Sequence, residues 1–326
     1  MRAWRVHELG EPQDVLALEE LPQPQPGGGQ VRVRVEATAL NFFDILLCQG
    51  TYQEKPPLPF TPGAEVAGVV VAAGEGAALQ VGQRVLGAPG LPNGGFAEEV
   101  LLDAPNAFPI PDTMDSVAAS ALFITYQTGW FGLHRRAALK PGETLLVHAG
   151  AGGVGSAAIQ LGLAAGARVI ATAGGAEKVE ICRKLGAEVA VDYTTEDFVA
   201  AVKEATGGRG ADVIYDSVGG ETFDLSRKCI AFEGRLVVVG FASGRIPAAP
   251  ANHALVKNYS VVGLHWGLYR KVIPELIPQA HEELMALHER GQIKPLIYDE
   301  LPLDDAPAAL AKLGQRGTWG KVVLKP

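Results

Sequence analysis

The first part of the chain alternates apolar and polar side chains in short runs that are typical of β-strands. QVRVRVEATAL (30–40) places apolar residues at nearly every second position, as a strand with one buried face does. Further apolar runs lie within PGAEVAGVVVAAG (62–74) and VGQRVLGA (81–88), and glycine and proline separate them. The pattern predicts a β-rich N-terminal domain.

From residue 143 onward, short apolar runs alternate with longer segments of helical periodicity. Strands are predicted at 143–150, 168–173, 188–193, 211–219 and 235–240, with helices between the first four at 153–167, 176–187 and 195–208. Strands that alternate with helices predict right-handed βαβ units and a parallel, doubly wound sheet.

The pattern changes again near the C-terminus. PELIPQAHEELMALHERGQI (274–293) predicts a helix, and WGKVVLKP (319–326) predicts a closing strand that rejoins the first domain. The whole chain of 326 residues has room for two domains.

Composition and charge exclude some classes of partner. The net charge is −8 and no block of lysine or arginine occurs, so we expect no nucleic-acid partner. Residues 116–133 and 144–167 carry no charged side chain and are long enough for a membrane span. They contain polar residues or many glycines, so we expect buried segments and no membrane partner.

The location expected from the sequence is cytoplasmic. Charged residues interrupt the first ten positions, which argues against a signal peptide. The three cysteines, Cys48, Cys182 and Cys229, are scattered, and reduced thiols are the plain interpretation.

The strongest motif is VHAGAGGVGSAA, which follows a predicted strand and opens a helix. Gly150, Gly152 and Gly155 fit the pattern G-x-G-x-x-G, which allows a tight turn, close backbone approach to a pyrophosphate, and helix packing. The N–H groups of Gly153 and Val154 at the helix start would face the phosphates. The alternative is a tight loop in a chain that contains 40 glycines. The strand–turn–helix context favours a dinucleotide site.

The end of the next strand indicates which dinucleotide. An NAD site places an acidic residue there to hold the ribose 2′-hydroxyl. Here the strand ends in Thr172, Ala173 and Gly174, all neutral, and Lys178 follows one helical turn later. This favours NADPH over NADH, although Lys178 taken alone could be a solvated surface lysine.

Over nearly its full length the chain resembles the zinc-free quinone oxidoreductases, also called ζ-crystallin-like, of the medium-chain dehydrogenase/reductase superfamily. The resemblance rests on LNFFD (40–44), QGTY (49–52), PPLPFTPGAEVAGVV (56–70), NGGFAEEV (93–100), TYQTGW (125–130), LKPGETLLVHAGAGGVG (139–155), YDSVGG (215–220) and GKVVL (320–324). It implies an α/β fold in which a GroES-like β-rich catalytic domain (1–123 and 264–326) accompanies a Rossmann doubly wound parallel sheet domain (124–263). It also implies a homodimer through the Rossmann domains.

The resemblance also implies roles for individual residues. Gly174, Lys178, Tyr193 and Arg316 match positions that grip the 2′-phosphate of NADPH. Asn41 and Thr128 match neighbours of the nicotinamide, and Tyr52 matches a tyrosine near the substrate cleft. Taken alone, Asn41 could be a turn cap, Thr128 a helix residue and Tyr52 an interface aromatic.

The zinc ligands of metal-dependent relatives are not present. In the resemblance, Asn41 and Ala64 stand where Cys and His would bind the metal, and only Glu65 persists. A catalytic zinc needs three protein ligands and an open position, so we expect none here. Without a Lewis acid an alcohol is a poor substrate, whereas a quinone or a conjugated alkene is already electrophilic.

The sequence therefore predicts NADPH-dependent, metal-free reduction of quinones, with Tyr52, Asn41 and Thr128 serving the reaction. One alternative is an enone or enoyl-thioester (alkenal) reductase. An alternative of another class is a nucleotide-binding structural or RNA-binding ζ-crystallin-like protein, which the acidic charge disfavours. The sequence departs from the family pattern at Leu46, Leu47 and Tyr126, so the resemblance does not give the shape of the acceptor pocket.

Overall fold

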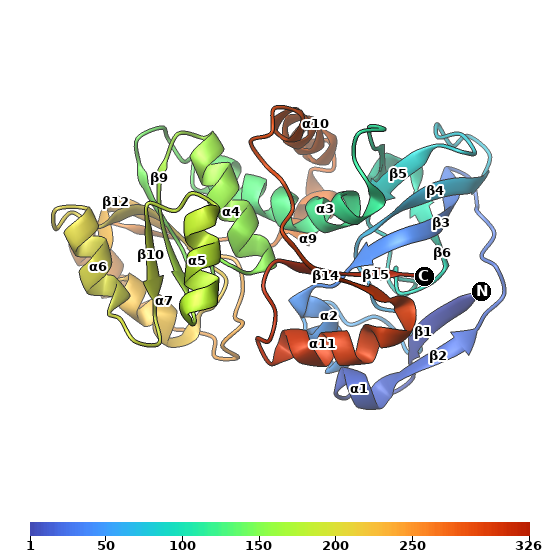
Figure 1. The fold of residues 1–326 in the computed structure, drawn as a ribbon, viewed down its shortest axis with the longest axis horizontal. Coiled ribbons are helices and arrows are strands. Elements are labelled where there is room, and N and C mark those ends of the chain that lie inside the picture. The colour runs from blue at the N-terminus through green and yellow to red at the C-terminus, as the bar shows by residue number, and fades with distance from the viewer. The chain divides into compact units, whose positions relative to one another are not determined.

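The computed structural model describes residues 1–326, which form two compact units (Figure 1). Unit 1 comprises Met1–Ile124 and Pro295–Pro326, and unit 2 comprises Thr125–Lys294. The boundary falls inside helix α3 (Ser116–Trp130).

Residues 264–294, which we expected in the catalytic domain, lie in unit 2. Two hydrogen bonds join helix α10 (Leu276–Glu289) to the last turns of α3. Gln127 Nε2 donates to Ile277 O over 3.1 Å, and Trp130 Nε1 donates to Glu283 Oε2 over 2.7 Å. These contacts are between residues distant in sequence, so no local pattern shows them.

Unit 1 is built on a seven-stranded sheet of order β14-β15-β3-β4-β5-β7, with β6 paired to β3. Only β14 and β15 run parallel; the other pairs are antiparallel. The strands are β3 (Gln30–Ala39), β4 (Val66–Ala73), β5 (Arg84–Gly87), β6 (Glu99–Asp103), β7 (Ala107–Pro109), β14 (Ile297–Pro302) and β15 (Lys321–Lys325). The predicted closing strand is confirmed as β15, which pairs with β3 through Val323↔Ala39.

A two-stranded sheet and short helices complete unit 1. They are β1 (Arg2–Val6), β2 (Leu16–Glu20), α1 (Pro12–Val15), α2 (Phe42–Cys48), α11 (Ala306–Gly314) and the 3₁₀ turns Ala104–Asn106 and Leu303–Asp305. The side chains of Leu40, Ile45 and Leu310 are buried in one apolar cluster beneath α2 and α11. This cluster fixes the start of α2, where Asn41 lies.

Unit 2 contains a six-stranded, all-parallel sheet of order β10-β9-β8-β11-β12-β13. When the six strands are numbered by their sequence in the chain, their order across the sheet is 3-2-1-4-5-6, which is that of dinucleotide-binding sheets. The strands are β8 (Thr144–Val147), β9 (Arg168–Ala173), β10 (Val189–Asp192), β11 (Ala211–Asp216), β12 (Ile230–Val238) and β13 (Ser260–Gly263). The predicted doubly wound parallel sheet is therefore confirmed.

The helices of unit 2 connect these strands or, at either end of the unit, flank them in the sequence; Figure 1 shows α4 and α5 beside β9 and β10. They are α4 (Gly153–Ala164), α5 (Ala176–Lys184), α6 (Phe198–Ala205), α7 (Gly220–Ser226), α8 (Ala251–Lys257), α9 (Trp266–Val272), α10 and the π-helix Phe131–Arg136. The uncharged stretches form α3 with the following turn, and β8 with α4. None of the helices combines the length and hydrophobicity that a bilayer-spanning segment requires.

Candidate functional site

The glycine-rich loop of unit 2 leads directly from β8 into α4. Gly152 is the N-cap of α4, and no side chain caps this helix. The backbone N–H groups of Gly153, Val154 and Gly155 in the first turn therefore remain available to an anion, which the helix dipole also attracts. The residues present fit a dinucleotide pyrophosphate at this helix start.

The three glycines of the motif are required for different reasons. A Cβ at Gly155 would lie 2.1 Å from Ala149 O, so only glycine lets α4 approach the turn. A Cβ at Gly152 would have one neighbour within 4 Å, Ala149 O at 3.2 Å, so the space around Gly152 is otherwise open. The tight turn that we expected at Gly150 is made at Ala149, which has a φ of +50°. Gly150 is needed for packing, because its Cβ would lie 2.9 Å from Cys182 Sγ.

The buried side chain of His148, at the start of this loop, is held by two hydrogen bonds. Ser226 Oγ donates to Thr222 O over 2.6 Å, so it accepts from His148 Nε2 at 2.8 Å. His148 Nδ1 is then the acceptor for the Thr172 hydroxyl at 2.9 Å. Burial lowers the pKa of His148 to about 4, so the ring is neutral near pH 7. This network was not expected from the sequence, although a histidine between an apolar strand and the first glycine was a signal.

The end of β9 brings together two of the residues expected at the 2′-phosphate. A Cβ at Gly174 would lie 2.8 Å from the Tyr193 hydroxyl, so the tyrosine ring packs against this glycine. Tyr193 is 45% exposed, and Lys178 is the third residue of α5, which begins two positions after Gly174. Arg316 belongs to unit 1, in the turn after α11, with a φ of +59°.

One carboxylate lies close to this position. Asp192 Oδ1 accepts from Gly175 N at 3.0 Å and from the Thr194 hydroxyl at 2.6 Å. These bonds lower the pKa of Asp192, with the Thr194 hydroxyl the largest cause, so the carboxylate is ionised. Its negative charge therefore lies beside Gly175, the residue that follows Gly174.

In unit 1, Asn41 at the start of α2 belongs to a buried polar cluster. Lys321 Nζ donates to Asn41 Oδ1 at 2.7 Å, to Glu65 Oε1 at 2.8 Å and to Leu40 O at 2.6 Å. Asn41 Nδ2 donates to Glu65 Oε1 at 2.9 Å. The Lys321 and Glu65 side chains are 4% and 0% exposed. Lys321 was not among the site residues expected from the sequence, although it lies in the motif GKVVL (320–324).

The strand register explains this cluster. Antiparallel pairing of β15 with β3 sets Val323 opposite Ala39, and continuing it by two residues sets Lys321 opposite Asn41. Glu65 immediately precedes β4, which pairs with the other edge of β3. Its second oxygen, Oε2, accepts from Ile124 N at 2.7 Å.

A catalytic zinc does not fit this donor set. The Glu65 carboxylate is already bonded to an ammonium and two N–H groups, and Asn41 and Ala64 supply neither thiolate nor imidazole. No group of three or more His, Cys, Asp or Glu side chains in the chain is arranged to hold a metal ion.

Asp44 is the other buried acid of this region. It accepts from Asn41 N at 2.8 Å and from Gly63 N at 3.1 Å, and it forms a capping box with Asn41 at the start of α2. Burial raises the pKa of Asp44 to about 7 against the opposing effect of these N–H groups. Asn41 is therefore a helix cap, as the plain alternative held, and also a member of the polar cluster.

Tyr52 lies in the turn after α2, with its ring stacked on Phe43 at a centroid distance of 5.3 Å. Burial raises its pKa to about 12, with smaller contributions from Glu54 and Asp44. The phenol is therefore protonated at any physiological pH and can donate a hydrogen bond.

Three other residues that the sequence pointed to are buried. Thr128 lies in α3 of unit 2 and is 8% exposed. Tyr126 is 1% exposed and its hydroxyl accepts from Gln160 Nε2 at 2.9 Å, so it belongs to the core of unit 2. Leu47 packs in the core of unit 1 with Phe60. Neither Tyr126 nor Leu47 is free to line an open acceptor pocket.

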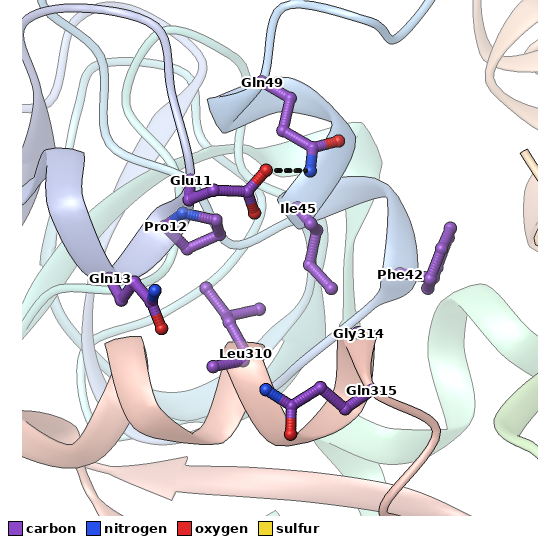
Figure 2. Close-up of a pocket in the computed structure, with 10 residues that line it drawn as sticks. Glu11, Pro12, Gln13, Phe42, Ile45, Gln49, Leu310, Gly314 and Gln315 are labelled. Carbon is purple, nitrogen blue, oxygen red and sulfur yellow. Dashed lines mark hydrogen bonds between the residues drawn. The ribbon is translucent and has the colours of Figure 1, made fainter.

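A separate hollow of about 390 Å³ lies between α1, α2 and α11 of unit 1 (Figure 2). Phe42, Ile45 and Leu310 form its apolar wall, and Glu11 accepts from Gln49 Nε2 at 2.9 Å along its rim. Its lining includes none of the site residues expected from the sequence.

Comparison with known proteins places the chain in a family. Residues 27–112 match the family described as "Alcohol dehydrogenase GroES-like domain", and residues 153–282 match "Zinc-binding dehydrogenase". A quinone oxidoreductase-like protein 2 homolog of Nematostella vectensis is 43% identical over 99% of this chain and 88% of its own length. The chain belongs to the medium-chain dehydrogenase/reductase superfamily.

Within this superfamily the relatives are quinone oxidoreductase-like. The solved structure of Escherichia coli quinone oxidoreductase complexed with NADPH is 32% identical, covers 100% of both chains and has a TM-score of 0.93. The CurK enoyl reductase structure is 29% identical, covers 99% of this chain and 98% of its own, and has a TM-score of 0.88. This medium-chain dehydrogenase/reductase thus has the GroES-like and Rossmann domains of an oxidoreductase family.

Proposed function

We propose that this protein reduces quinones with NADPH and without a metal. The observation that carries the proposal is the buried Lys321–Glu65–Asn41 cluster, in which Asn41 stands where the resemblance would put a zinc ligand and Lys321 bonds to both other members. With no metal to stabilise an alkoxide, a substrate that is already electrophilic suits the site better than an alcohol.

The residues of each unit would serve this reaction in separate ways. In unit 2, the first N–H groups of α4 bind the pyrophosphate, while Lys178 and Tyr193 contact the 2′-phosphate. In unit 1, Arg316 adds a second cation for that phosphate. Asn41 and Thr128 contact the nicotinamide, which supplies a hydride when the cofactor is bound.

Tyr52 is the proposed hydrogen-bond donor to the acceptor. Its phenol keeps its proton because its pKa is raised to about 12. A neutral donor stabilises negative charge that develops on the acceptor oxygen. Water can protonate a reduced quinone afterwards, so Tyr52 assists and is not an obligatory acid.

A second candidate function is reduction of an enone or enoyl thioester. The likeness to the CurK enoyl reductase supports it. An alkene differs from a quinone in needing a proton at carbon, so an essential proton donor would be expected. The two functions therefore make opposite predictions for Tyr52→Phe.

An NADPH-oxidation screen tests the proposal directly. The acceptors are ortho-quinones, para-quinones, enals and crotonyl thioesters, each with NADPH and with NADH. Preferential turnover of quinones supports the proposed function, and preferential turnover of thioesters or enals supports the second candidate. A protein that binds NADPH but turns over none of these acceptors would point to a structural or RNA-binding role.

We further propose a cytoplasmic homodimer. Cys48, Cys182 and Cys229 are all free and buried, which suits a reducing compartment. Strand β13 is an edge of the parallel sheet with one side unpaired, and such edges readily pair with another chain. Several side chains within residues 232–272 of unit 2 are apolar and exposed. They are Phe232, Ile246, Leu255, Val256, Val261, Leu268 and Val272.

A further inference from the structure

The hydrogen bonds of Lys321 use every donor that its ammonium has. A lysine has three N–H groups, and three acceptors lie between 2.6 and 2.8 Å from Nζ: Leu40 O, Asn41 Oδ1 and Glu65 Oε1. Lys321 therefore has no hydrogen left to donate to a substrate. Its cation is also paired with the Glu65 carboxylate, so the cluster offers little net positive charge.

The same bonds fix which way the Asn41 amide points. The ammonium can only donate, so it must face Oδ1 and not the NH₂ group. Nδ2 then faces Glu65 Oε1 at 2.9 Å and Ala39 O at 3.3 Å, which takes both of its hydrogens. Asn41 thus offers a ligand no donor, and Oδ1, which also faces the Asp44 N–H in the capping box, is the one acceptor of its amide.

We propose that Lys321 is a positioning residue that sets Asn41 as a hydrogen-bond acceptor for the NH₂ of the nicotinamide carboxamide. This inference rests on the proposed function, because it assumes that Asn41 contacts the nicotinamide. It has two consequences. Asn41 cannot donate to the oxygen of the acceptor, which leaves that task to Tyr52. The site also selects a nicotinamide ring whose substituent carries an N–H.

The test compares NADPH with its reduced 3-acetylpyridine analogue, whose acetyl group keeps the C=O but lacks the NH₂. Binding is measured by fluorescence titration, without any acceptor. The wild-type protein should bind NADPH more tightly, by about two- to tenfold, the effect of one neutral hydrogen bond.

The variants remove the ammonium of Lys321, which fixes the orientation of the Asn41 amide. Lys321→Met alone leaves Glu65 buried and unpaired and should lower the melting temperature, so the double variant Glu65→Gln/Lys321→Met is used beside it to recover stability. In the double variant Asn41 is free to turn its NH₂ toward the acetyl oxygen. The preference for NADPH should therefore shrink toward equality. Lys325→Met, on the same strand with an exposed ion pair to Glu300, is the matched control and should keep the wild-type preference.

The outcomes separate this inference from the proposed function. A wild-type protein that binds both nucleotides equally, or a double variant that keeps the wild-type preference, would overturn the positioning role. A double variant with recovered stability and a lost preference would support it, since a purely structural role would recover both. Failure to reduce any quinone would overturn the proposed reaction while leaving the binding result intact, whereas failure of the wild type to bind NADPH would overturn both.

Discussion

Lys321 Nζ lies 2.8 Å from Glu65 Oε1, and both side chains are buried. The two residues are separated by 256 positions in the sequence, and only the pairing of β15 with β3 and of β3 with β4 brings them together. In the low-dielectric interior, breaking such a pair by removing one partner typically costs about 3–5 kcal/mol. The pair thus helps to hold β15 and the start of β4 on either side of β3.

Metal removal should have no effect on this protein. Exhaustive EDTA treatment is expected to leave both the melting temperature and NADPH oxidation unchanged, because an ammonium already satisfies the Glu65 carboxylate. Elemental analysis provides the second measurement. Stoichiometric, tightly bound zinc would contradict the prediction.

The cations Lys178 and Arg316 should decide cofactor choice. Each would make a charge-assisted contact with the 2′-phosphate, worth roughly 1.5–3 kcal/mol. Replacing either by alanine should weaken NADPH binding by about tenfold or more and leave NADH binding nearly unchanged. Lys184→Ala, on the same helix α5 but in its last turn, is the matched control. Equal losses for both cofactors would show that the residues do not contact the phosphate.

Tyr52→Phe should lower kcat/KM for quinones only modestly. The loss of one hydrogen bond is worth roughly 0.5–1.5 kcal/mol, up to about tenfold in rate. Tyr52→Ala should cost more, because it also removes the ring that stacks on Phe43. Steady-state kinetics of both variants make the measurement. An essentially inactive Tyr52→Phe enzyme would favour the alkene reductase, and wild-type kinetics on every quinone would place Tyr52 outside the site.

Acid should destabilise the folded protein through its buried histidines. Burial lowers the pKa of His148 and of His281 to about 4, below the ordinary value of 6.5. Between these values the unfolded chain binds protons that the folded histidines do not, so the stability that the two histidines contribute falls as the pH drops from about 6.5 to about 4. Asp44, whose pKa burial raises to about 7, offsets part of this fall. Each histidine contributes up to about 1.4 kcal/mol per pH unit in this range.

Denaturant unfolding between pH 8 and pH 4 measures this effect. His148→Asn should be less stable at neutral pH, since it breaks the bonds to Thr172 and Ser226. Its stability should nevertheless fall less steeply with acid. A slope identical to that of the wild type would show that His148 does not titrate as described.

Disrupting the edge strand should separate the proposed dimer. Val261 lies in β13 and is 39% exposed. Val261→Asp introduces a charge at the unpaired edge and is expected to yield a monomer in light scattering coupled to gel filtration. Val81→Asp, at a residue 64% exposed in unit 1, is the control and should keep the wild-type mass. A monomeric wild-type protein would refute the proposal.

Much of unit 2 could be predicted from the sequence because the deciding features are local. Alternating strands and helices imply a parallel sheet, and the predicted strand at 168–173 coincides with β9. The glycine motif places the start of α4 for a similar reason, since a strand, a tight turn and a helix are adjacent in the chain. Even so, the left-handed turn residue is Ala149 and not Gly150, and Gly150 is required instead by its packing against Cys182.

The sequence by itself therefore determined the alternation of Rossmann strands and helices along the chain, the glycine-rich loop and the absence of thiolate and imidazole at Asn41 and Ala64. Only the tertiary structure decided what those two positions are joined to. Hydrogen-bond partners of a buried side chain depend on strand register and on segments far apart in the chain, as with Lys321 and Asn41, separated by 280 positions. The same holds for His148 with Ser226, and for Tyr126, whose burial against Gln160 no local pattern of apolar residues encodes.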